Sequence, residues 1–168
     1  MPIRPIKFGA TPPREDAVPE PDLASSRRLA GPKFSAKVPM VGRWVAVLDH
    51  ARRDRGLVLN SHSTRCIHAG EIHEFLVCRT PPGQRTGAID AVSYLGFGEF
   101  LVAGVIALGD ELWVQGQPLG EVIGFDETHM PNHQNIVIYS DNTACGSELG
   151  LVPYDLFHLE CPQEERHA

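Results

Sequence analysis

From residue 41 onward, apolar residues come in short runs that turn-forming residues interrupt. Runs of this length, bounded by Gly, Pro, Asn or Asp, are typical of β-strands. A long amphipathic helix needs apolar residues spaced three and four apart, and no such stretch follows. The pattern therefore predicts an all-β domain, a small β-barrel of short antiparallel strands. The runs lie at residues 44–48, 56–59, 72–78, 88–95, 100–108 and 136–139.

Residues 109–124 carry the clearest local pattern, that of a β-hairpin. Leu112 and Val114 alternate with polar or amphipathic neighbours, and Gly116-Gln117-Pro118 predicts a tight turn before a second strand. Near the end of the chain, residues 149–159 fit either a closing strand or a short helix after Pro153.

Residues 1–40 differ from the rest because they hold eight of the fourteen prolines. Proline fixes φ and lacks a backbone donor, so neither helix nor sheet runs easily through such a stretch. We therefore expect a flexible proline-rich arm at residues 1–38, a single β-barrel domain at 39–162 and a frayed tail at 163–168. Wrapping around a partner subunit is the alternative role for this arm.

The chain of 168 residues has a formal net charge of −6 and 42% hydrophobic residues. This composition permits a globular core, and the acidic excess argues against binding to nucleic acid or to an anionic membrane. No apolar stretch is long enough for a membrane span or a secretory signal. The four cysteines form no CxxC pair, which argues against a thiolate zinc site. Since neither a signal peptide nor a span is expected, we expect a cytoplasmic protein with free thiols.

The segment between the apolar residues 122–123 and 136–138 concentrates side chains that titrate or bind metal. It holds Asp126, Glu127, His129 and His133. Histidine changes charge near neutral pH and is the commonest metal ligand, and a neighbouring carboxylate can orient it or exchange its proton. These four residues are therefore the predicted catalytic residues.

Two chemistries remain open for this polar loop. Pro131 argues against one helix carrying both histidines, so a helical His-Glu-x-x-His zinc site is not expected. His129, His133 and Asp126 can still converge as a two-histidine, one-carboxylate site for a divalent ion such as Zn, Fe or Mn. Acid–base chemistry without metal is the second possibility. A rigid turn whose polar side chains satisfy backbone groups is the structural alternative.

A second group of histidines lies at residues 62–73, beside Arg65. The planar guanidinium of Arg65 can pair with a substrate carboxylate or phosphate. Glu71 and His73 share one face of a strand by its period of two, and that face can point into the barrel and meet the polar loop. Exposed loop histidines and a strand with one wet face would give the same pattern. The expected substrate-binding residues are Arg65, His73, Asn132, Asn135 and Tyr94.

Residues 109–141 resemble the C-terminal half of the sorbitol (glucitol)-specific IIA component of the sugar phosphotransferase system. The resemblance lies in Gly109-Asp110-Glu111-Leu112, the hairpin to Gly120-Glu121-Val122, and Asn132-His133 leading into Ile136-Val137-Ile138. It implies a compact β-barrel with a phosphorylatable histidine in its N-terminal half, where His68 and His73 are the nearest candidates. The chain as a whole is similar to a type of small bacterial protein.

These patterns predict a small-molecule enzyme of the lyase, isomerase or cyclase type. Its His, Asp and Glu side chains would move protons in a barrel pocket, with or without a bound metal. A phosphocarrier or ligand-binding module related to the IIA proteins, and a structural subunit whose arm docks on another chain, are the alternatives. The expected partner is a small-molecule substrate, without nucleic acid or membrane. A small barrel with an extended arm often forms a homodimer.

Overall fold

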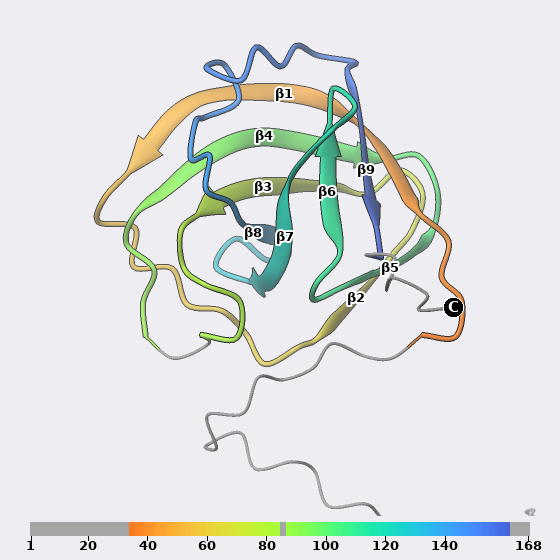
Figure 1. Cartoon of the computed structure of the whole chain (residues 1–168), viewed down its shortest axis with the longest axis horizontal. Coiled ribbons are helices and arrows are strands. Elements are labelled where there is room, and N and C mark those ends of the chain that lie inside the picture. Colours follow the sequence, from red (N-terminus) through yellow and green to blue (C-terminus); the bar gives the residue numbers. More distant parts are fainter. Residues whose placement is uncertain (1–33, 85–86, 162–168) are drawn as a thin grey trace, which may run out of the picture.

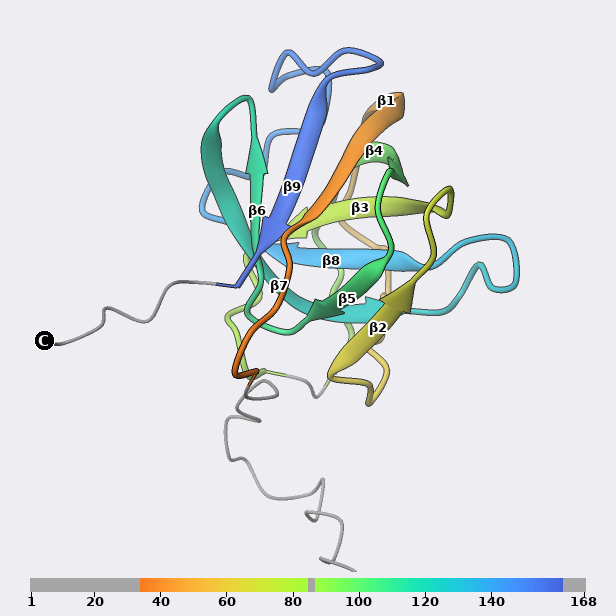
Figure 2. The same cartoon turned by 90° about the vertical axis from the view of Figure 1, so that its right-hand side faces the viewer.

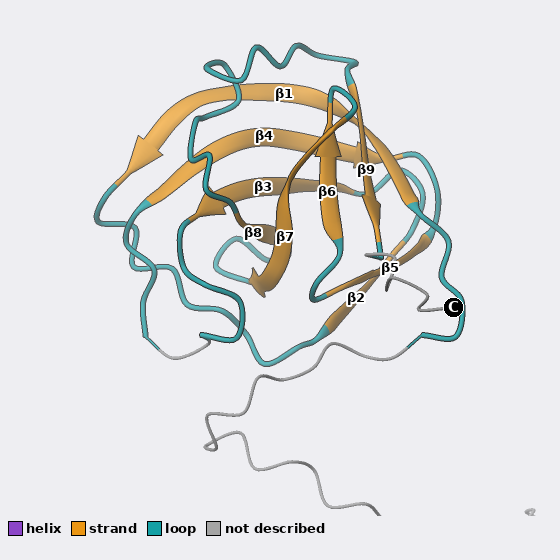
Figure 3. Cartoon of the chain, in the orientation of Figure 1, coloured by secondary structure: helices purple, strands orange, loops and turns teal. Residues whose placement is uncertain are grey.

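The computed structural model describes residues 34–84 and 87–161, which form strands and loops without a helix (Figure 3). Seven of the described strands close into a barrel in the order β1-β4-β3-β8-β7-β6-β9, with β9 paired to β1; β2 and β5 form a separate ribbon (Figure 1). The expected all-β barrel is confirmed. The strands are β1 (Met40–Arg52), β2 (Thr64–Ile67), β3 (Ile72–Cys78), β4 (Val92–Phe100), β5 (Gly104–Ala107), β6 (Glu111–Val114), β7 (Gln117–Asp126), β8 (Asn135–Tyr139) and β9 (Leu156–Glu160).

One pairing in the barrel departs from the expected antiparallel pattern. Strands β3 and β8 run parallel, with Glu74 beside Asn135. Parallel neighbours need a long crossover connection, and here the chain between them forms β4 to β7. As a result, the first residues of β3 lie beside the point where the polar loop enters β8.

The predicted hairpin at residues 109–124 is confirmed as β6 and β7, but its turn lies earlier than the sequence suggested. Gln115 and Gly116 form the turn with φ values of 51° and 74°. Two consecutive positive φ angles suit a two-residue hairpin turn, because the twist of that turn matches the twist of the flanking strands. Pro118 lies inside β7, opposite Trp113. Of the two possibilities for residues 149–159, the strand is correct: β9 begins at Leu156.

Aromatic side chains fill the interior of the barrel. The ring centroid of Phe157 lies 4.9 Å from that of Trp44, 5.0 Å from that of Phe75 and 5.5 Å from that of Phe100, and all four side chains are buried. Gly98 allows this approach, since a Cβ there would lie 2.6 Å from the Phe157 ring. The interior is therefore a packed core, and any ligand site on the described residues belongs at the surface or the ends of the barrel.

A second apolar cluster covers the outer face of the sheet. Leu57 and Leu59 pack there against Leu76 and Val137. The run at 56–59 was expected to be a strand, which is wrong: it is an irregular segment held by one isolated bridge from Leu57 to Ile89. Its apolar residues are needed for packing rather than for strand pairing.

The expected proline-rich arm lies outside the described residues apart from 34–38, and the expected tail at 163–168 lies outside them entirely. Across 34–84 and 87–161, no helix offers the length and apolar surface that crossing a bilayer requires.

Candidate functional site

The polar loop between β7 and β8 projects from one side of the barrel (Figure 2), and side chains at the two strand ends close its base. Asp126 accepts a hydrogen bond from Asn135 Nδ2 and another from Thr128 Oγ1, both at 2.7 Å. Asp126 and Asn135 are buried. The apolar flanks are thus anchored in the core, as the sequence predicted, and the loop starts and ends at fixed positions.

Within the loop, the two histidines lie against each other. The backbone N–H groups of Asn132 and His133 donate to the His129 carbonyl at 2.9 and 3.4 Å, which folds the loop back on itself. The imidazole rings of His129 and His133 stack with centroids 4.9 Å apart. The edge of Phe97 packs on His133, whose side chain is largely buried, whereas His129 is exposed. One imidazole is held by packing and the other faces solvent.

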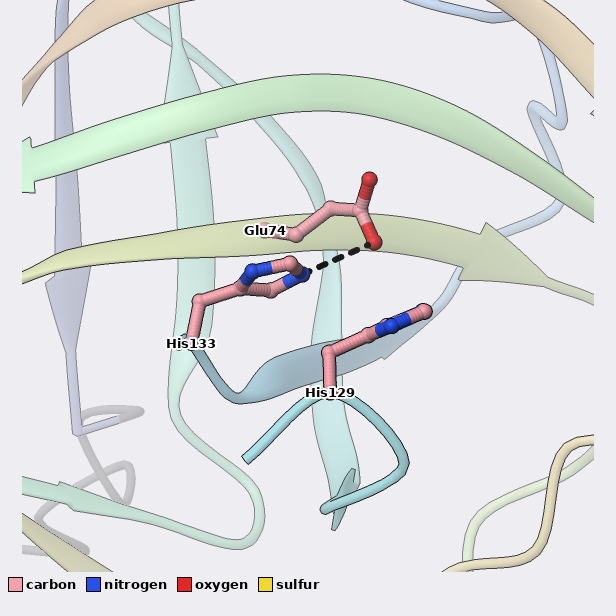
Figure 4. Close-up of side chains that lie close together, drawn as sticks. All are labelled: Glu74, His129 and His133. Atoms are coloured by element: carbon pink, nitrogen blue, oxygen red, sulfur yellow. Dashed lines mark ion pairs between the residues drawn. The ribbon is translucent and has the colours of Figure 1, made fainter. Parts of the chain in front are cut away.

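Glu74 completes a cluster of three potential metal ligands (Figure 4). One ligand atom each from Glu74, His129 and His133 lies within 4.8 Å of the other two. Glu74 is buried on β3, and its Oε2 lies 3.6 Å from His133 Nε2. This distance is too long for a hydrogen bond, and the buried His133 Nε2 has no hydrogen-bond partner among the described residues. His133 Nε2 and the Glu74 carboxylate therefore face each other without a hydrogen bond between them.

Burial shifts the pKa values of both buried members of this cluster. Burial raises the pKa of Glu74 to about 6. The positive charge of Arg55 opposes this rise in pKa, and the negative charge of Asp126 adds to it. Burial, together with His129 and His73, lowers the pKa of His133. At neutral pH the carboxylate is therefore mostly ionised and the imidazole neutral, which are the forms that bind a metal ion.

A guanidinium lies at the edge of the cluster. Arg55 Nη2 is 3.4 Å from His129 Nε2 and 3.6 Å from Asp126 Oδ2, and the Arg55 side chain is mostly buried. The backbone N–H of Arg55 donates to the Asp90 carbonyl, which helps hold the irregular segment after β1 in place. A fixed positive charge thus adjoins the exposed histidine.

Two of the four predicted catalytic residues, His129 and His133, belong to the ligand cluster, whereas Asp126 and Glu127 do not. The Asp126 carboxylate is occupied by Asn135, Thr128 and Arg55, so it positions the loop and the guanidinium. Glu127 is exposed and lies 3.4 Å from Gln134 Nε2.

His73 supports the polar loop from inside the barrel. Its Nδ1 accepts a hydrogen bond from the Gln134 backbone N–H at 3.1 Å, so its Nε2 carries the proton and donates to Glu71 Oε2 at 2.8 Å. Glu71 and His73 therefore share a face, as predicted from the period of two. Arg65 pairs with the same Glu71 oxygen at 3.3 Å. The predicted substrate-binding residues Arg65 and His73 thus form a chain of polar contacts behind the loop.

The remaining predicted substrate-binding residues are dispersed. Asn132 is exposed, and its Nδ2 lies 2.9 Å from His133 Nδ1. Asn135 lies at the base of the loop, where it holds Asp126. Tyr94 is buried in the outer apolar cluster and stacks on His50 with ring centroids 5.1 Å apart. Asn132 thus contacts His133 through its side chain, and Asn135 lies beside Glu74 in the pairing of β3 with β8.

Sequence reasoning missed Glu74 and Arg55. Glu74 stands inside the apolar run of β3, and a carboxylate in such a run needs a partner if it is buried. The position of Glu74 in an apolar run therefore indicates that it has a partner, but it does not identify the residue. Arg55 stands in a basic turn that predicts an exposed position, and nothing local indicates that its side chain reaches the end of β7.

Comparison with known proteins adds one finding. The chain matches the model of one protein family across residues 34–160, which is most of its length, and the description of that family is "Family of unknown function (DUF6917)". No curated protein and no solved structure matches the chain.

Proposed function

The chain belongs to DUF6917, a family of unknown function, and from its own geometry we propose that it is a metal-dependent small-molecule enzyme whose ion is held by Glu74, His129 and His133. The observation that carries this proposal is the convergence of three ligand atoms within 4.8 Å of one another, two of them from the projecting loop and one from β3.

The chemistry of the donors favours a first-row transition metal. Two imidazoles and one carboxylate suit Zn, Fe or Mn, and three protein ligands leave coordination positions free for water or substrate. The exposure of His129 provides access from solvent. Asn132 supports the ligand role of His133, because a flip of its amide lets it accept from a protonated Nδ1 while Nε2 binds the ion.

Arg55 suggests an anionic substrate. An ion bound at His129 Nε2 would take the lone pair that faces Arg55 Nη2, 3.4 Å away, so the guanidinium would have to move aside and would keep an N–H to donate. A cation beside a guanidinium is also repulsive unless an anion lies between them. A substrate carboxylate that contacts both the ion and Arg55 would accept the free N–H and would screen the two positive charges from each other. The lyase, isomerase and cyclase reactions expected from the sequence fit such a site, since a metal-bound carboxylate makes an adjacent C–H more acidic.

Metal binding is tested on protein stripped with a chelator and titrated calorimetrically with Zn²⁺, Mn²⁺ or Fe²⁺. We expect one ion per chain, and a loss of about a hundredfold in affinity for Glu74→Gln and for His133→Ala. His68→Ala is the matched control, because His68 is exposed on the turn between β2 and β3, outside the cluster. Unchanged affinity in His133→Ala would refute the site.

Catalysis is tested by solvent exchange. Metal-loaded protein is incubated in D₂O with a panel of small carboxylic acids, and proton NMR follows loss of the signal next to the carboxylate. We expect exchange of at least one acid by the wild type and none by His129→Ala/His133→Ala. If the protein binds metal but exchanges no acid of the panel, it is a metal-binding protein and the proposed enzyme class is rejected.

The phosphocarrier alternative now depends on His68. Both ring nitrogens of His73 are engaged and its side chain is buried, whereas His68 is exposed. Incubation with a phosphorylated carrier protein followed by mass spectrometry would support this alternative if phosphate appears on His68. The cytoplasmic setting expected from the sequence is also a proposal, which the free state of all four cysteines supports.

A further inference from the structure

The ends of β1 and β3 and the start of β4 lie at the left of Figure 1. Residues from these strand ends line a cavity of about 410 Å³. Arg52 and Arg53 reach it from the end of β1, and Arg79 from the residue after β3. Thr143, in the loop between β8 and β9, also lines the cavity. Ends of barrels are common places for small-molecule binding.

The cavity gathers positive charge in a chain of net charge −6. Three of the seven Lys and Arg residues in the described part of the chain line it. Arg52 pairs with Asp54 at 3.2 Å, but neither Arg53 nor Arg79 forms an ion pair with a described residue. The Nη2 of Arg79 donates to the Asp141 carbonyl at 2.9 Å, a contact that orients the guanidinium without neutralising it.

The lining holds one carboxylate, that of Glu148, against three guanidinium groups, so its formal charge remains positive. Glu148 uses its Oε2 to accept the backbone N–H of Cys145 at 2.9 Å, within its own loop. Two arginines without an ionic partner among the described residues therefore line the same cavity. Guanidinium groups bind carboxylate and phosphate oxygens through paired N–H donors.

The floor of the cavity is apolar. The exposed Ala51 and Ala91 provide its accessible apolar surface, Val77 and Val92 on the same lining are buried, and Ser93 adds a hydroxyl. A bare inorganic anion would leave this apolar surface in contact with water. A ligand with an anionic head and a short apolar body would cover the floor and meet the arginines together.

We propose that this cavity is a second ligand site, for a small organic anion whose carboxylate or phosphate head lies between Arg53 and Arg79 and whose apolar body packs on Ala51 and Ala91. The site is separate from the metal cluster. Glu74 and Arg79 are five residues apart along β3 and its end, which corresponds to about 16 Å of extended chain. The proposal does not depend on the metal.

The test is calorimetric titration of the full chain with three probes: inorganic phosphate, hexyl phosphate and hexanoate. We expect saturable binding of hexyl phosphate or hexanoate that is about tenfold or more tighter than that of inorganic phosphate. Tighter binding of hexyl phosphate identifies a phosphate head, and tighter binding of hexanoate a carboxylate head. Equal affinity for phosphate and hexyl phosphate would overturn the proposal, because the floor would then contribute nothing.

The variant Arg53→Gln/Arg79→Gln should weaken binding of the better probe about tenfold or more. Arg43→Gln is the matched control, since Arg43 lies on β1 in an ion pair with Glu99, outside the cavity. Because both target arginines are exposed, the double variant should fold, which its melting curve verifies. Absence of saturable binding to all probes, or unchanged affinity in the double variant, would overturn the assignment.

Discussion

Glu74 Oε2 lies 3.6 Å from His133 Nε2, a separation that brings a carboxylate and an imidazole face to face without a hydrogen bond between them. Both side chains are largely buried, and the parallel pairing of β3 and β8 brings them together. Burial of polar groups with unused bonding capacity is unfavourable. A metal ion between them would satisfy both.

Glu74→Gln keeps the shape of the side chain and removes its charge. Because burial raises the pKa of Glu74 to about 6, the metal-free protein at neutral pH holds a carboxylate that burial disfavours. We expect metal-free Glu74→Gln to melt at a higher temperature than metal-free wild type, and to gain no thermal stability from added metal. Scanning fluorimetry measures both. A lower melting temperature with an intact metal response would contradict the ligand role.

The same pKa makes a prediction for stability against pH. The folded-state pKa of Glu74, about 6, lies above its usual value of 4.5, so the folded protein holds this proton more tightly than the unfolded chain. The contribution of this group to stability is complete below 4.5 and is lost as the pH rises through 6. We therefore expect the free energy of unfolding of Glu74→Gln to rise relative to wild type across this window, as measured by urea denaturation at several pH values.

Metal affinity should have the opposite pH dependence. A proton on Glu74 competes with the ion, so affinity should fall about tenfold for each pH unit below the Glu74 pKa of about 6. Titration of the stripped wild type with metal at several pH values, from about pH 5 to about pH 8, measures this slope. Histidine also titrates in this range. A flat profile across the Glu74 pKa would exclude that carboxylate as a ligand.

Asp126→Ala and His129→Ala should separate loop support from metal binding. Asp126 accepts from Asn135 and Thr128 and pairs with Arg55, so its loss should cost about 3 kcal/mol of unfolding free energy. His129 is exposed, and its replacement should change stability by about 0.5 kcal/mol at most while abolishing tight metal binding. Urea denaturation and metal titration of both variants provide the comparison. A reversed pattern would show that Asp126 is the ligand.

Gly98→Ala tests the packing inside the barrel. The added Cβ would lie 2.6 Å from the Phe157 ring and 2.9 Å from the Phe75 ring, so it should destabilise the fold by about 1–3 kcal/mol. Combination with Phe157→Leu should cost less than the sum of the two single changes, because the smaller side chain makes room. Full additivity in chemical denaturation would mean that the two positions do not share space.

The candidate site shows which relationships can be predicted from nearby residues. His129 and His133 lie four positions apart between two apolar runs, so a short loop with anchored ends holds them near each other. Glu71 and His73 share a face because a strand has a period of two. The same local rules predicted the β-barrel and the hairpin of β6 and β7, although Gln115 and Gly116 form the turn in place of the expected residues.

The amino-acid sequence thus determined the strand pattern, the polar loop and its pair of histidines, since each depends on the spacing of neighbouring residues. Only the tertiary structure decided that Glu74 is their partner and that Arg55 adjoins them. Both depend on the parallel pairing of β3 with β8 and on the packing of Leu57 and Leu59 against the outer face. Contacts between distant segments follow from the packing free energy of the whole chain, which no single stretch of sequence contains.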